Sequence, residues 1–378
     1  MAGYIFNFDN INALIRCLKF GVYATRNFTP KNNKWLRPHE GTFADYASMK
    51  EDDDVYFFIK RKIFGIGKLV NIGRDCKYFN FPGAGQPKVY DYKSVKPKLL
   101  WDEGRLSVGQ RMVCFFKPGP CFFKEGIDMD DALSFDPGAF RMLRAFWKLS
   151  FVKFGDEENN ALKSVLLKRN EDASDVYKWP FDEKLHERIA GQIDDDYEFS
   201  TAPMLKACAD GDSLDHEMAI ELDLVAQLSR KKAKASLVFG GWDYLTHQVV
   251  ASPFKPIDYM DKMDVFGYRY VKGHRPIISK YLVIELKKVK AKSDDLIQLM
   301  KYVDWIRNEY CGGDYSMIEA YLVAKEFGAE VTSRCDSMSL RSYVVGMKPP
   351  VQKEWSSLKL VKYVYDTEQS ETVFKIIN

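Results

Sequence analysis

The chain is poor in the residues from which many metal and redox sites are built. Its 378 residues include only 5 histidines and 7 cysteines. The histidines are isolated from one another, which argues against a metal site built from imidazole ligands. No C-x-x-C pair occurs among the cysteines, so neither a zinc ribbon nor a disulfide framework is supported. Reduced, mostly buried thiols in a cytoplasmic protein fit this pattern best.

Long apolar runs and a charge excess are also missing. No window approaches the ~18–20 apolar residues of a membrane span, and the first residues, MAGYIFNFDN, lack the basic start of a secretory signal. Lys and Arg total 56 against 53 Asp and Glu, a formal net charge of +3. This balance excludes a histone-like polycation but permits a local basic groove. A Gly-rich phosphate loop and a nucleophile elbow are absent too, which argues against a small-molecule enzyme.

What is present is a chain long enough for two domains, at roughly 100–200 residues per domain. The first part is rich in short strands and turns, and a helical pattern follows over 140–169. We predict an N-terminal domain over 1–170, a polar and acidic linker over 171–212, and a C-terminal domain over 213–378. The strand-like runs of the first domain are 54–60, 63–71 and 112–117.

The second half has a clear order of elements. Apolar periodicity predicts helices over 214–230 and 294–309. The expected strands lie near 236–239, 248–251, 263–270, 280–289 and 318–324, with a last pair at 358–365 and 372–377. The result is an αβββαβ order, which predicts an α/β (α+β) domain with a mixed sheet flanked by helices.

One strand in this order carries two charges. Residues two apart in a strand share a face, so Glu285 and Lys287 project together while Leu282, Ile284 and Leu286 face the core. A carboxylate and an ammonium on a strand that is otherwise apolar are costly unless they share a site or a metal. The alternative is a solvated sheet face with incidental ion pairs.

A second carboxylate is expected on the neighbouring strand. Three aspartates, Asp258, Asp261 and Asp264, precede the strand, and we favour Asp264 because its flanks Val265 and Phe266 are apolar. An antiparallel return would bring Asp264 beside Glu285 at the end of the sheet. Hard oxygen ligands of this kind suit Mg²⁺, for which Mn²⁺ would substitute.

This segment resembles the PD-(D/E)XK nuclease superfamily over about residues 212–330. Besides the D…E-x-K hairpin, a leading helix offers Glu217 and Glu221, and the helix after the strand carries Gln298 and Tyr302. The last pair looks like the Q-x-x-x-Y element of RecB-type and NucS-type branches. All four residues have a plain alternative as ordinary helix-surface side chains.

The resemblance implies a Mg²⁺-dependent DNA endonuclease that hydrolyses phosphodiester bonds. Asp264, Glu285 and Glu221 would hold the cation, and Asp264, Glu285, Lys287 and Gln298 would be the catalytic residues. Because this nuclease class uses no histidine base, we predict that His247 is a hydrogen-bonded structural residue. The rival class is a non-catalytic binding module for nucleic acid or protein on a nuclease-like scaffold.

Further nucleic-acid contacts are expected from side chains close to this hairpin. The basic run that contains Lys288 and Lys290 follows the strand directly and would contact phosphates, although a solvated loop is an equal alternative. Tyr302 is expected on the same surface.

The N-terminal half resembles PUA-like barrels of the EVE and YTH type. The resemblance lies in the strands DVYFF at 54–58 and GIG at 65–67. It implies a nucleic-acid recognition domain with a PUA-like β-barrel, in which aromatic rings hold a flipped modified base. The rings expected to form such a cage are Trp35, Phe43, Tyr46 and Trp101, and their alternative is a place in the barrel core.

Restriction or anti-phage defence is the expected biological setting of such a nuclease, and DNA repair is the next. Double-strand cutting would favour a homodimer.

Overall fold

The computed structural model of the chain contains two compact units, Met1–Ala207 and Cys208–Asn378. The residues that the structure describes are 2–26, 35, 37–119, 121–123, 125–140, 151–169, 176–178, 180–230, 234–251 and 261–378. Within these ranges, no helix combines the length and the apolar character that crossing a membrane requires.

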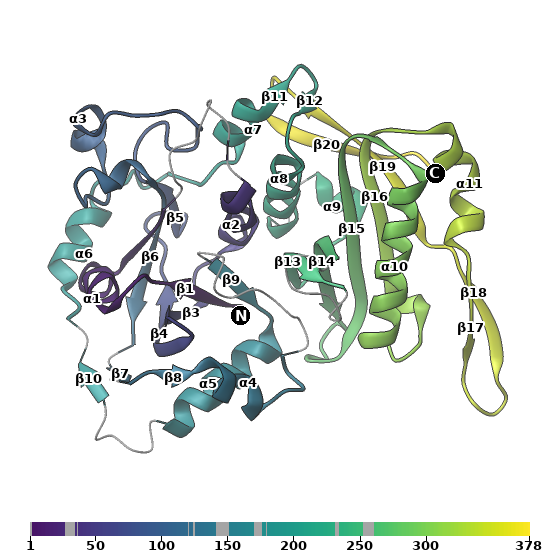
Figure 1. The fold of residues 1–378 in the computed structure, drawn as a ribbon, viewed down its shortest axis with the longest axis horizontal. Coiled ribbons are helices and arrows are strands. Elements are labelled where there is room, and N and C mark those ends of the chain that lie inside the picture. The colour runs from purple at the N-terminus through teal and green to yellow at the C-terminus, as the bar shows by residue number, and fades with distance from the viewer. Residues whose placement is uncertain are drawn as a thin grey trace. The chain divides into compact units, whose positions relative to one another are not determined.

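The first unit is built on a mixed eight-stranded sheet (Figure 1). Its main path is β2-β6-β4-β3-β1-β9, with β5 beside β6 and β8 beside β4. The strands are β1 (Gly3–Asn7), β2 (Val22–Arg26), β3 (Asp54–Ile59), β4 (Lys62–Leu69), β5 (Lys77–Phe79), β6 (Gln110–Pro118), β8 (Ile127–Asp128) and β9 (Phe151–Phe154). A separate ribbon pairs β7 (Cys121–Phe123) with β10 (Val176–Lys178). The barrel stays a prediction, since the described pairs leave β2 and β9 as the two ends of the path.

Seven helices accompany these strands in the described part of the unit. They are α1 (Ile11–Phe20), α2 (Arg37–Ser48), α3 (Tyr92–Val95), α4 (Met129–Phe135), α5 (Asp156–Arg169), α6 (Glu183–Ala190) and α7 (Ala202–Cys208), the last ending one residue into the second unit. Local sequence sets the ends of α1. The Asn10 side chain accepts the Ala13 amide at its start (3.0 Å), and Gly21 ends it in the left-handed region (φ +63°).

The strands predicted at 54–60, 63–71 and 112–117 are confirmed as β3, β4 and β6. The helix predicted over 140–169 was wrong at 151–154, where β9 lies, and 141–150 fall outside the described residues. The β9 segment Phe-Val-Lys-Phe is aromatic and β-branched, and it is buried by antiparallel pairing with β1. A long-range partner therefore decided its conformation.

The second unit contains a six-stranded mixed sheet in the order β13-β14-β15-β16-β19-β20. The neighbours from β13 to β15 are antiparallel, those from β15 to β19 are parallel, and β20 returns antiparallel to β19. The strands are β13 (Tyr244–Val250), β14 (Lys262–Tyr270), β15 (Ile278–Ala291), β16 (Ile318–Phe327), β19 (Leu358–Asp366) and β20 (Glu371–Ile376). Two short ribbons pair β11 (Ala209–Asp210) with β12 (Ser213–Leu214) and β17 (Arg341–Val345) with β18 (Val351–Trp355).

In the described part of this unit, four helices flank the sheet. They are α8 (Glu217–Ser229), α9 (Ala235–Phe239), α10 (Ser293–Glu309) and α11 (Ala329–Ser339). Figure 1 shows α8 on one side of β15 and α10 on the other. The predicted αβββαβ order is present as α8, β13, β14, β15, α10 and β16, with α9 inserted after α8.

One element of the second half was predicted wrongly. The segment 236–239, expected as a strand, lies in helix α9. Its last residue, Phe239, packs edge-on against Tyr321 and Phe374 with ring centroids 4.9 and 5.3 Å apart. A short apolar run of this kind fits a buried helix as well as a strand.

Candidate active site

The site is organised by the register of three neighbouring strands. Val265 of β14 pairs with Ile284 of β15, and one further step along this antiparallel register sets Asp264 opposite Glu285. Residues that face each other across an antiparallel pair project to the same side of the sheet. The carboxylates of Asp264 and Glu285, which the sequence predicts to be neighbours, therefore lie on the same side of the sheet.

Glu285 and Lys287 share a face of β15, as their spacing predicts. The Lys287 ammonium donates to Oε1 of Glu285 over 2.5 Å, and it lies 3.9 Å from Oδ1 of Asp295 on α10. Burial acts to lower the pKa of Lys287, but the charge and hydrogen bond of Glu285, together with the charges of Asp264 and Glu217, raise that pKa above its ordinary value. The ammonium is therefore charged and held in place.

The second oxygen of Glu285 is in a different situation. The residue is only 1% exposed, and its Oε2 is buried without a hydrogen-bond partner. Burial raises the pKa of Glu285 to about 7, against the Lys287 charge, and Glu217 and Asp295 push in the same direction as burial. An unpartnered carboxylate oxygen costs free energy, so this oxygen is a position at which a ligand would be stabilising.

Asp264 is held from two sides. Its Oδ2 accepts the backbone amide of Leu286 (2.8 Å), and its Oδ1 accepts the side-chain amide of Gln248 (3.2 Å). Burial raises the pKa of Asp264 well above its ordinary value, and the charges of Glu285 and Glu221 raise it further. Asp264 thus lies opposite Glu285 on the hairpin and shares the Gln248 amide with Glu221.

Helix α8 contributes the two glutamates that the sequence indicated. Glu221 is 6% exposed, and its oxygens bind His247 Nδ1 (2.5 Å) and Gln248 Nε2 (3.1 Å). Glu217 is exposed at the first turn, where Oε1 accepts the Lys288 amide (3.3 Å). Glu221 is therefore the inner carboxylate and Glu217 the outer one.

Strand β13 supplies a residue that the sequence reasoning missed. His247 behaves as predicted, as a buried and hydrogen-bonded residue. Gln248, however, reaches both Glu221 and Asp264 with its amide nitrogen. A glutamine in a strand carries no signal of its own, because its partners come near only when α8 docks on β13 and β13 pairs with β14.

Helix α10 places Gln298 and Tyr302 beside each other. The Gln298 amide donates to the Tyr302 hydroxyl over 2.6 Å. Tyr302 is buried, and burial together with the nearby Glu285 charge raises its pKa. The two residues therefore form one unit next to the carboxylates.

The predicted residues that remain in the second unit are two lysines near the end of β15 and two aspartates that precede β14 in the sequence. Lys288 is exposed and its ammonium donates to the Asp215 carbonyl (2.9 Å), and Lys290 is exposed as well. Asp261 directly precedes β14, whereas Asp258 lies outside the described residues. The two lysines thus lie at the solvent-exposed end of β15.

The rings predicted as a cage lie in the first unit, and all four are buried. Trp35, Phe43, Tyr46 and Trp101 are at most 4% exposed. The Tyr46 hydroxyl donates to the Val113 carbonyl (2.6 Å) and accepts the Tyr78 amide (2.7 Å).

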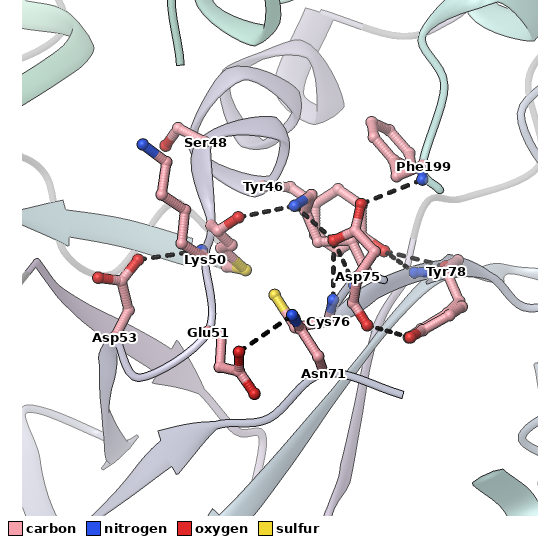
Figure 2. A network of polar contacts seen from close by, with 12 residues as sticks. Tyr46, Ser48, Lys50, Glu51, Asp53, Asn71, Asp75, Cys76, Tyr78 and Phe199 are labelled. Carbon is pink, nitrogen blue, oxygen red and sulfur yellow. Dashed lines mark hydrogen bonds and ion pairs between the residues drawn. The ribbon is translucent and has the colours of Figure 1, made fainter. Parts of the chain in front are cut away.

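Around Tyr46, Figure 2 shows a polar network that ties neighbouring segments together. Asp75 lies at its centre and accepts the amides of Cys76 (2.7 Å) and Phe199 (3.1 Å). Lys77 also donates to Asp75, over 2.6 Å. The burial of Tyr46 within this network fits the core alternative that its sequence left open.

The donor set decides whether a cation fits the site. Among the described residues, no group of three or more His, Cys, Asp or Glu side chains is arranged to hold a metal ion. Asp264 and Glu285 nevertheless offer carboxylate oxygens, one of them buried and unpartnered. Two carboxylates suit Mg²⁺, which keeps several water ligands.

Comparisons with known proteins give few matches. No protein-family model and no curated protein matches the chain. Among solved structures, a repair endonuclease from Pyrococcus abyssi is 22% identical, with 35% of this chain aligned to 46% of that one and a TM-score of 0.21. The EndoMS complex with double-stranded DNA is also 22% identical, over 28% of this chain and 39% of that one, with a TM-score of 0.18.

A third match is a hypothetical protein from Leishmania major. It is 14% identical, with 45% of this chain aligned to 95% of that protein and a TM-score of 0.28. The chain thus spans less than half the length of the two endonuclease structures. TM-scores this low do not establish a shared fold.

Proposed function

We propose that the protein is a Mg²⁺-dependent endodeoxyribonuclease of the PD-(D/E)XK type. The observation that carries this proposal is the state of Glu285: Oε1 binds the Lys287 ammonium while Oε2 is buried and unpartnered opposite Asp264. A carboxylate held in this way has one oxygen for a cation and one for a charged donor. Phosphodiester hydrolysis uses both functions.

Each side chain has a role that follows from its contacts. Asp264 and Glu285 would hold the cation, with Glu221 beside them; the chemistry supplied by such a cation is polarisation of a phosphoryl oxygen and activation of water. Lys287, oriented by Glu285, would donate to the phosphate oxygen on which negative charge develops. The Gln298 and Tyr302 pair would orient substrate or water from α10, and Lys288 and Lys290 would contact neighbouring phosphates.

The first unit is proposed as the DNA-recognition part, with a PUA-like fold. The two strands that carry its motif, β3 and β4, are antiparallel neighbours. A Cβ on Gly67 of that motif would lie 2.7 Å from the Lys117 carbonyl, so close packing with β6 explains this glycine. A base would reach Trp35 or Tyr46 only after the unit opens locally, because both rings are buried.

Restriction or anti-phage defence is the proposed setting, with a modified base as the recognised feature and a homodimer as the cutting form. Matched plasmids with and without base modification, incubated with Mg²⁺, test the activity and its target. Plaque counts on cells with and without the gene test the setting, and light scattering of the protein on DNA tests the dimer.

The decisive variants are Glu285→Ala and Lys287→Ala. We expect both to abolish cleavage while folding and DNA binding are retained. The matched controls are Lys353→Ala and Glu354→Ala, which change an exposed Lys and Glu on β18 of the same unit and should cleave normally. Full activity of either site variant would contradict the mechanism.

One observation favours the rival function, a binding module on a nuclease-like scaffold: no three-ligand metal group occurs among the described residues. Calorimetry with Mg²⁺ or Mn²⁺ on the wild type and on Asp264→Ala separates the two. Binding that is weakened in the variant supports the nuclease, and equal heats support the scaffold.

A further inference from the structure

The backbone conformation of Gln248 is unusual for a residue inside a strand. Gln248 lies within strand β13 but has φ +51°, in the left-handed region. Residues other than glycine rarely adopt this conformation, and in a strand interior it is unfavourable. Such residues persist where the surrounding structure holds them, and they gather at functional sites.

The side chains at this point of β13 do not alternate as in a regular strand. In a regular strand, consecutive side chains project to opposite faces. Here the consecutive residues His247 and Gln248 both reach the carboxylate of Glu221, over 2.5 and 3.1 Å. Gln248, which the register sets opposite Asp264, therefore shares Glu221 with the residue before it, and the left-handed backbone lies where the alternation is lost.

That amide bridges two of the proposed cation ligands. Nε2 of Gln248 donates to Oε2 of Glu221 (3.1 Å) and to Oδ1 of Asp264 (3.2 Å). A side-chain amide has two N–H donors, so one nitrogen satisfies both acceptors. It thereby offsets the repulsion between carboxylates that lie close together, which is also what a bound cation would do.

We propose that Gln248 is an internal substitute for the cation. Its amide holds Glu221 and Asp264 in place in the cation-free protein, and it leaves these oxygens when the cation binds. The unpartnered Oε2 of Glu285, which the amide does not reach in the described contacts, completes the set of oxygens available to the cation. This inference rests on the proposed function, because it assumes that the carboxylates take up a cation.

The test uses Mn²⁺ alone, without DNA, and the full chain. Gln248→Ala removes the competing donor, so calorimetry should show Mn²⁺ binding about fivefold tighter, the effect of one typical hydrogen bond. Without cation, the variant should melt at a lower temperature than the wild type. At saturating Mn²⁺ this difference should shrink, whereas a purely structural role would lower both melting temperatures equally.

Two further variants keep the test decisive. Gln248→Gly removes the same amide and suits φ +51°, so it serves if the alanine variant fails to fold. Gln352→Ala, an exposed glutamine on β18, is the matched control and should bind Mn²⁺ like the wild type. Equal or weaker Mn²⁺ binding by the Gln248 variants overturns this inference alone. No Mn²⁺ binding by the wild type overturns the proposed function with it.

Discussion

Lys287 and Glu285 lie two residues apart on β15, with the ammonium 2.5 Å from one carboxylate oxygen. The other oxygen of Glu285 is buried and has no partner. The glutamate is therefore only half satisfied, with one oxygen bound to the ammonium and the other left without a partner. From this asymmetry we expect the protein to respond to pH, to substitution of either residue and to divalent cations.

The first prediction concerns stability and pH. Folding raises the pKa of Glu285 from 4.5 to about 7, so between these values the folded protein holds a proton that the unfolded chain releases. The stability from this group is thus complete below pH 4.5 and declines as the pH rises toward 7. Glu285→Gln should lack this decline, which amounts to about 3 kcal/mol. Urea unfolding at pH 5 and pH 8 measures this decline in stability. Parallel profiles of stability against pH for the wild type and Glu285→Gln would contradict the prediction.

The second prediction concerns Lys287→Met. The Lys287 charge lowers the pKa of Glu285, so its removal leaves more of the carboxyl protonated at neutral pH. A protonated carboxyl does not bind a cation, so Mn²⁺ affinity at pH 7 should fall roughly tenfold and recover at higher pH. Calorimetry between pH 6 and 9 checks this, with Lys353→Met as the control. Unchanged affinity at pH 7 would mean that the two groups do not interact in solution.

The third prediction concerns the exposed lysines after the site. Lys290→Ala should weaken DNA binding at all sequences and reduce the salt slope of log K by about 1, because one phosphate contact is removed. Fluorescence anisotropy over a salt series measures the slope. Lys375→Ala removes an equally exposed lysine from β20 and should leave it unchanged. Equal slopes for all three proteins would remove Lys290 from the DNA contact.

The fourth prediction concerns Tyr46 in the first unit. Tyr46→Phe removes the hydroxyl that binds the Val113 carbonyl and the Tyr78 amide. Buried polar groups then lose a partner, which should cost about 1–3 kcal/mol of unfolding free energy. DNA affinity should be unchanged, since the ring itself is retained and buried. A loss of affinity without a loss of stability would instead support the cage role.

Much of the second unit was predictable because its elements obey local rules. The period of two residues in a strand set Glu285 and Lys287 on one face, and apolar periodicity located α8 and α10 correctly. These features depend on neighbours within a few residues, and such neighbours are visible in a sequence. The carboxylate pair follows from one hairpin, which is also a local feature.

Tertiary structure decided the features that depend on distant partners. The segment 151–154 became a strand because β1 pairs with it, and Tyr46 became a core residue because β5 and β6 enclose its hydroxyl. Gln248 joined the site because α8 docks on β13 and because β13 pairs with β14, which brings Glu221 and Asp264 to its amide. The sequence by itself determined the charged strand and the shared face of Glu285 and Lys287. Only packing between segments far apart in the chain determined which groups surround that strand, because burial and contact are properties of the assembled fold.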